Sequence, residues 1–134
     1  MEESYMLTEG MSAVLTCQVT EENTAKTIGS GSLLVFGTPA MIALIEQTAV
    51  ALLEGNLPEG TTTVGTKLNI DHVSATPMGM TAECECTLTQ IDRKKLVFDV
   101  IVKDEAGVIG KGSHERFMVD VEKFMEKAES KAKE

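Results

Sequence analysis

The stretch TPAMIALIEQTAVALL, residues 38–53, constrains the fold more than any other part of the chain. Thr38 and Pro39 are a helix-start signal, with Thr as the N-cap and Pro at the first helical position, and Gly55 is a stop signal. The helix between these signals is apolar on most sides, which predicts that it is buried. Glu46 interrupts the run, and a carboxyl group in apolar surroundings needs either a satisfied structural role or a chemical one.

Length and charge narrow the class of protein. The chain has 134 residues, so we expect residues 1–134 to form a single domain with its own core. The formal net charge is -9, with 12 basic residues against 21 acidic ones, which argues against a nucleic-acid partner. The longest apolar stretch, residues 39–53, is too short and too interrupted to span a membrane. The first residues, MEESYM, are acidic where a secretory signal is basic, so we expect a cytoplasmic protein.

The pattern after the helix is that of strands. Residues 11–19 already predict one strand, and after the turn at 57–60 the period changes to two. One face of the next strand is predicted to carry Val64, Thr66, Leu68, Ile70 and His72. Residues 80–89 alternate cleanly between wet and dry positions, which is typical of an antiparallel sheet with one covered face.

Short links join the last strands. The segments 92–95 and 104–107 connect residues 80–89 to 96–102, and these to a final strand over about 108–119. From Asp120 the spacing of apolar residues predicts a short amphipathic terminal helix. One buried helix and one long sheet with a single dry face fit each other if the sheet curls around the helix. The expected class is therefore α+β, a hot-dog fold with a five-stranded antiparallel sheet.

Two ionisable residues fall within the predicted core. Glu46 has aliphatic neighbours at its i±3 and i±4 positions, and His72 lies on the strand face expected to meet the helix. The alternatives are a Glu46 that points into solvent or bridges a subunit contact, and a His72 that is a satisfied core residue. Together they could place a carboxylate and an imidazole in one cavity.

Three segments resemble the hot-dog thioesterases of the fluoroacetyl-CoA thioesterase type: TPAMIALIE (38–46), GTKLNIDHVSATP (65–77) and GSHER (112–116). The likeness runs from about residue 11 to the terminal helix. It implies hydrolysis of an acyl-CoA without a cofactor or metal, with catalytic residues Thr38, Glu46 and His72. It also implies that the backbone N–H of Gly65 meets the acyl group and that Arg116 lies near the acyl end of the pocket.

One segment departs from that family. Members specialised for the fluorinated substrate are expected to close the site with aromatic side chains before the central helix, whereas residues 28–32 read IGSGS here. We therefore expect a thioesterase for short or medium acyl-CoA, or a related small acyl thioester. A non-catalytic acyl-CoA or small-ligand binding module, and a hot-dog hydratase or dehydratase, are the alternatives that the same fold allows.

The position of Thr38 raises a geometric difficulty. Eight residues along an α-helix span about 12 Å, so Thr38 and Glu46 of one chain cannot share a hydrogen bond if the helix is regular from residue 38. Either the helix starts later, or the two residues meet across subunits, as the resemblance implies for a homodimer. The alternative is that Thr38 is only an N-cap.

The chemical roles stay open at this point. Glu46 could attack the thioester directly to give an anhydride or act as general base on water, and His72 could activate water or donate a proton. His114 is expected to be structural or exposed. Cys84 and Cys86 share a strand face, but no second Cys or His pair completes a metal site. We expect these cysteines to be free thiols.

Overall fold

The computed structural model describes residues 7–133. Residues 1–6, on whose acidity the expectation of a chain without a secretory signal partly rests, lie outside the described residues, as does residue 134. Within the described part, no helix combines the length and the apolar character needed to cross a membrane.

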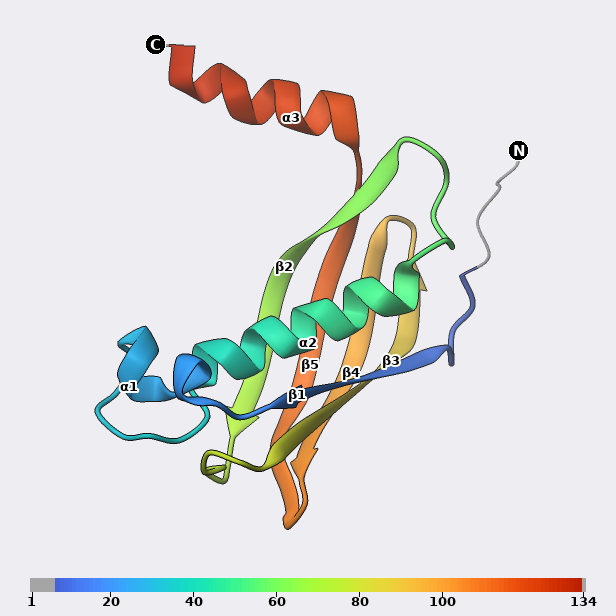
Figure 1. The fold of residues 1–134 in the computed structure, drawn as a ribbon. Helices are drawn as coiled ribbons and strands as arrows, with labels where there is room; N and C mark the ends of the chain where they lie inside the picture. Colours follow the sequence, from blue (N-terminus) through green and yellow to red (C-terminus); the bar gives the residue numbers. More distant parts are fainter. Residues whose placement is uncertain (1–6, 134) are drawn as a thin grey trace.

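Among residues 7–133, five strands form one antiparallel sheet, as predicted (Figure 1). The strands lie side by side in the order β1-β3-β4-β5-β2. Their bounds are β1 Ser12–Gln18, β2 Thr61–His72, β3 Thr81–Asp92, β4 Lys95–Asp104 and β5 Gly107–Asp120. Because β2 is at one end of this order, it hydrogen-bonds to β5 on one side and leaves its other edge unpaired within the described chain.

The central helix α2 (Thr38–Leu53) lies across one face of the sheet (Figure 1). The position predicted for Thr38 is wrong by one residue. The N-cap is Gly37, with extended backbone angles, so Thr38 and Pro39 occupy the first helical turn. Proline is tolerated there because its missing N–H is not needed in the first turn. The helix is regular from Thr38 onward, which excludes a later start.

The burial of α2 is one-sided, which corrects the expectation of a helix covered on most sides. One face enters the core with Met41, Leu44, Ile45, Thr48, Ala49, Leu52 and Leu53. On another side Ile42, Glu46 and Val50 follow one another at intervals of four residues and stay partly or fully exposed. Val50 is 44% exposed. The protomer therefore leaves an apolar strip on α2, interrupted by the Glu46 carboxylate.

Strand β2 departs from the predicted alternation because it contains a β-bulge. Gly65 pairs with Arg116, whereas Leu68 pairs with His114, and the register shifts between Gly65 and Lys67. Paired residues share a face of the sheet, so the side facing α2 changes from odd to even positions at the bulge. Leu68, Ile70 and His72 lie on the predicted face. The assignment of Val64 and Thr66 to it is wrong, since Thr63 and Gly65 occupy that side before the bulge.

Short helices complete the chain. Ahead of α2 lie a 3-10 turn, η1 (Glu21–Asn23), and α1 (Ala25–Ile28), which ends at Gly29 with a left-handed φ of 80°. The sequence pattern did not predict α1. The predicted terminal helix is α3 (Val121–Ser130), followed by a 3-10 turn, η2 (Lys131–Lys133). Asp120 caps α3 by accepting a hydrogen bond from the Lys123 amide at 3.0 Å, and the helix extends away from the sheet (Figure 1).

Candidate functional site

The first polar pair joins the start of α2 to the end of β2. The Thr38 hydroxyl lies 2.7 Å from His72 Nδ1. His72 Nε2 is buried and has no hydrogen-bond partner among the described residues. Burial lowers the pKa of His72 below its ordinary value of 6.5, and the backbone at Ser74 opposes part of that shift. The imidazole is therefore neutral near pH 7 and can accept a proton.

A pocket of about 270 Å³ opens beside this pair. Helix α1, the loop before α2 and the segment after β2 provide its other walls, at Ala25, Ser30, Val35, Phe36 and residues 73–75. Ser30 belongs to the IGSGS segment. This segment therefore places a small polar side chain, rather than an aromatic one, beside Thr38 and His72.

The second polar group is centred on Glu46. Its Oε2 lies 3.3 Å from NH1 of Arg116, and the two side chains are 40% and 8% exposed, respectively. Gly65 lies directly against this pair, because a Cβ atom at that position would collide with Glu46 Oε2. A side chain at position 65 would displace the carboxylate, so glycine is required for this close approach.

Arg116 is held by three further hydrogen bonds. Its Nε donates to the Thr63 hydroxyl at 2.9 Å, and its NH2 donates to the Thr63 carbonyl at 3.2 Å. NH1 lies 3.2 Å from Nε2 of His114. An arginine can only donate, so His114 Nε2 accepts, and its Nδ1 carries the proton that it donates to the Lys67 carbonyl at 2.9 Å. The guanidinium is thereby fixed beneath Glu46.

The fully buried His114 is neutral as well, because burial lowers its pKa as it does that of His72. Burial lowers its pKa below 6.5, and the positive charge of Arg116 adds to that shift, while the Lys67 carbonyl and nearby carboxylates oppose it. The ring stacks on Phe98 with 5.9 Å between centroids. The prediction of a structural His114 fits this environment, and its exposure is excluded. Thr63 was not singled out from the sequence, because its contact with Arg116 depends on the register before the bulge.

The structure thus gathers the sequence-predicted residues into two groups. Thr38 and His72 form one, and Glu46, Gly65 and Arg116 form the other. Thr38 and Glu46 are separated by eight residues of regular helix, about 12 Å. A role for Thr38 only as N-cap is wrong, since Gly37 is the N-cap and the Thr38 hydroxyl contacts His72.

The cysteines lie apart from both groups. Cys84 and Cys86 are buried and free, with their Sγ atoms 4.0 Å apart. Among residues 7–133, no group of three or more His, Cys, Asp or Glu side chains is arranged to hold a metal ion. The two polar groups themselves offer a carboxylate, an imidazole and a hydroxyl.

Comparison with known proteins places the chain in a family. The model of the fluoroacetyl-CoA-specific thioesterase family matches residues 19–122. The fluoroacetyl-CoA thioesterase of Streptantibioticus cattleyicolor is 33% identical over 97 residues, which cover 72% of this chain and 70% of that protein. The chain belongs to the fluoroacetyl-CoA-specific thioesterase family. It is a thioester hydrolase, as the resemblance in the three sequence segments predicted.

Solved structures agree with this assignment. The fluoroacetyl-CoA thioesterase FlK is 26% identical and superimposes with a TM-score of 0.88, covering 94% of this chain and 98% of that one. A variant of FlK was solved in complex with acetyl-CoA. A hot-dog-like protein from Thermanaerovibrio acidaminovorans, 20% identical, has a TM-score of 0.85 over 92% of this chain and 91% of that one. The predicted hot-dog fold is confirmed.

Proposed function

We propose that this family member hydrolyses the thioester of a short or medium acyl-CoA, or a related small acyl thioester, with Thr38, Glu46 and His72 as its catalytic residues. The observation that carries the proposal is the 2.7 Å contact between Thr38 and His72 beside a pocket of about 270 Å³. A hydroxyl and a neutral imidazole at this distance have the geometry of proton transfer.

The site is completed by a second copy of the chain. Within one protomer Glu46 and His72 belong to different groups, yet both lie on the side of the molecule that carries the unpaired edge of β2 and the exposed apolar strip on α2. Leu68, 38% exposed, lies on the same strand edge. A homodimer that pairs β2 with its copy covers these apolar groups and joins two sheets into one.

The alternation of β2 limits the register of that pairing. Inner-face residues must oppose inner-face residues, and a two-fold axis at Asn69, which pairs Leu68 with the partner's Ile70, meets this condition. With that axis, His72 lies opposite the bulge formed by the partner's Thr66 and the partner's Gly65. Because Glu46 rests on Gly65 of its own chain, this register brings the carboxylate of one protomer to the imidazole of the other.

The chemistry divides among these groups. Glu46, beside Arg116, either attacks the thioester carbonyl, forming an anhydride and expelling the thiolate, or takes a proton from an attacking water. In the water route, neutral His72, hydrogen-bonded to Thr38, relays that proton from Glu46 to the departing thiolate. In the anhydride route, His72 takes the proton from the water that hydrolyses the anhydride and passes it to the thiolate. The Gly65 backbone N–H meets the carbonyl oxygen as negative charge develops on it, and Arg116 lies at the acyl end.

Subunit complementation tests both the activity and the shared site. Thiol release from acetyl- to octanoyl-CoA is measured for the wild type, for Glu46→Gln, for His72→Ala, and for the two variants unfolded together and refolded as a mixture. Half of the refolded dimers are mixed, and each has one intact site of two, so about a quarter of wild-type activity returns. No recovery would overturn the shared site, and a wild type that binds these thioesters without turnover would overturn the proposed reaction.

Borohydride separates the two routes for Glu46. When turnover is quenched with borohydride, an anhydride at Glu46 is reduced to an alcohol, and mass spectrometry of the peptide containing Glu46 detects the change. An unmodified peptide at full turnover identifies Glu46 as the general base.

The remaining features of the proposal concern organisation and location. We propose that residues 1–134 act as a single thioesterase domain and that the protein works in the cytoplasm, where acyl-CoA is formed and used. Fractionation of cells that produce the tagged chain tests the location, and sedimentation of the purified chain tests the dimer.

A further inference from the structure

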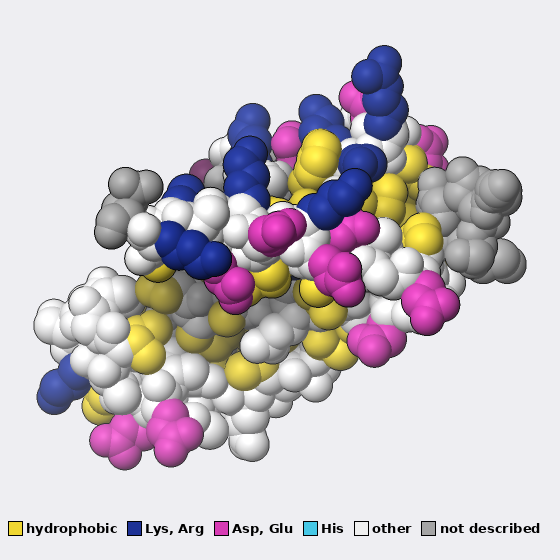
Figure 2. Space-filling model, turned by 90° about the horizontal axis from the view of Figure 1, so that it is seen from above, with side chains coloured by type: hydrophobic (Ala, Val, Ile, Leu, Met, Phe, Trp, Pro, Cys, Tyr) yellow, Lys and Arg dark blue, Asp and Glu magenta, His cyan; other side chains and the backbone are white. Residues whose placement is uncertain are grey.

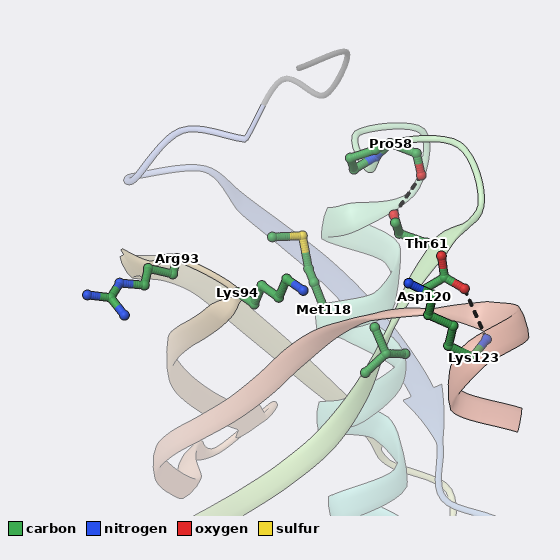
Figure 3. A pocket seen from close by; sticks show the side chains of 8 residues that line it. Pro58, Thr61, Arg93, Lys94, Met118, Asp120 and Lys123 are labelled. Atoms are coloured by element: carbon green, nitrogen blue, oxygen red, sulfur yellow. Dashed lines mark hydrogen bonds between the residues drawn. The ribbon is translucent and has the colours of Figure 1, made fainter. Parts of the chain in front are cut away.

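A pocket of about 480 Å³ lies at the end of the molecule that carries α3 and the β3–β4 turn (Figure 3). Its walls include Arg93 and Lys94 from the turn and Lys123 from α3. Figure 2 looks down on this end, where basic side chains project among acidic ones. Asp120 also lines the pocket, and its carboxylate accepts a hydrogen bond from the Lys123 amide. Three basic side chains against one carboxylate leave the pocket with a positive lining, which suits an anionic ligand in a chain whose net charge is -9.

A second hollow lies between this pocket and the helical turn that follows Glu46. Its volume is about 350 Å³, and it runs between the second half of α2 and the start of β2. It shares Thr61 with the basic pocket, and at its other end it reaches Val50, one turn beyond Glu46, and Thr63, which anchors Arg116. The two hollows adjoin at Thr61, and together they form a groove that ends one helical turn short of Glu46 and at the residue that anchors Arg116.

The length of the groove fits the substrate of the proposed reaction. Gly65 lies beside Glu46 and Thr61 borders the basic pocket, so four residues of strand, about 13 Å, separate Glu46 from the basic pocket. The arm of coenzyme A between the thiol and the pyrophosphate is, when extended, about as long as four to five residues of extended chain, roughly 15 Å. A thioester held at Glu46 thus delivers its phosphates to the basic pocket.

From these observations we propose that Arg93, Lys94 and Lys123 bind the phosphate groups of the CoA portion of the substrate, while the groove between α2 and β2 holds the pantetheine arm. This inference rests on the proposed function. Lysine and arginine form charge-assisted hydrogen bonds with phosphate oxygens, and the planar fork of arginine suits them in particular. Figure 3 shows Lys94 extending toward Met118 across the pocket, with Arg93 at the outer end of the turn.

The chain offers a variant that removes this charge at little cost to the fold. Arg93 has a φ of 61°, a left-handed conformation that asparagine adopts more readily than arginine does. Arg93→Asn therefore preserves the turn, and Lys94→Gln and Lys123→Gln keep the length and polarity of their side chains. Lys103→Gln is the matched control, because Lys103 is exposed at the opposite end of β4.

The test compares two forms of one thioester, an acyl-CoA and the same acyl group on pantetheine, which lacks the phosphates. We expect the wild type to prefer the CoA form and the triple variant to lose about tenfold of that preference, measured as the ratio of the two kcat/KM values. The preference should also fall with added salt, because exposed charges are screened. The Lys103→Gln control should retain it. An unchanged ratio in the triple variant would overturn the proposal.

A binding measurement keeps this inference separate from the proposed reaction. Adenosine 3′,5′-bisphosphate, titrated by calorimetry, should bind the wild type and the Lys103→Gln control and bind the triple variant about tenfold more weakly. If the protein hydrolyses no thioester but shows this pattern, the phosphate pocket stands and the reaction does not. If turnover is normal and the nucleotide binds all forms equally, the pocket proposal is wrong.

Discussion

The two polar groups along α2 are built in opposite ways. At its start, Thr38 and His72 share one short contact, and the remaining ring nitrogen of His72 is buried without a partner among the described residues. In its middle, Glu46 meets an arginine that makes further bonds to Thr63 and His114. A group that is to move protons needs an unoccupied position, whereas a group that is to hold a charge needs every position filled. The first group is suited to proton transfer, and in the second the firmly held Arg116 supplies the fixed charge that positions the Glu46 carboxylate.

Removing the reacting groups should have the largest effect. Glu46→Gln and His72→Ala are each expected to lower kcat by about 10²- to 10⁴-fold, because each removes a group that takes part in proton transfer or attack. Steady-state thiol release on acyl-CoA measures the loss, and circular dichroism verifies that both variants fold. If both variants kept wild-type turnover, the assignment of these residues would be rejected.

Arg116 should affect stability as well as activity. Arg116→Met leaves Thr63 and His114 without their partner and Glu46 without its counter-ion, so we expect a loss of roughly 2–4 kcal/mol in the free energy of unfolding. Arg116→Lys retains the charge but cannot reproduce the forked contacts, and an intermediate loss is expected. Urea unfolding measures both. Equal stability of all three proteins would mean that the network is not the anchor described above.

Substitutions at Thr38 distinguish a role for its hydroxyl from a role only in starting the helix. Thr38→Ser keeps the hydroxyl near His72 and should retain most activity, whereas Thr38→Val keeps the shape and should lose about tenfold or more in kcat. The helix begins at Gly37 in either case, so thermal stability should change little. Equal activity of the two variants would limit Thr38 to a packing role.

The pH dependence of stability should show the smallest effect. The pKa values of His72 and His114 are lowered in the folded state, so the unfolded chain binds more protons as the pH falls through 6.5. Stability is then constant above about pH 7 and declines below 6.5, because protonated His114 can no longer accept from Arg116. His114→Asn should flatten the decline in urea midpoints measured between pH 8 and pH 5. A steeper decline in that variant would contradict this origin.

The sequence predicted the helix and strands that carry the two polar groups better than it predicted the contacts within those groups. Start and stop signals mark α2 and hydrophobic period marks the strands, since both are local properties that each segment expresses by itself. The bulge between Gly65 and Lys67 has no such local mark, because register is decided by pairing with β5. The anchoring role of Thr63 was missed for that reason. The four-residue helix α1 is too short to show a period at all.

At Thr38 the local sequence signal is clear, but the contact that its side chain makes is not. Its place before Pro39 is a helix-start signal, and the helix does begin there, but the next residue toward the N-terminus takes the capping position. What the hydroxyl touches depends on where β2 ends, 34 residues further along the chain. That contact could be anticipated only through the resemblance to a known family.

The unpaired edge of β2 has a consequence for the life of the protein in solution. A bare strand edge beside exposed leucine and valine side chains is a template on which other polypeptides can add, and natural sheets avoid leaving one uncovered. If a second copy of the chain pairs with this edge, dimerisation both protects the chain from aggregation and completes its active site. At very low concentration the chain would then be monomeric, inactive and prone to aggregation. Both properties would disappear together as the concentration rises and dimers form.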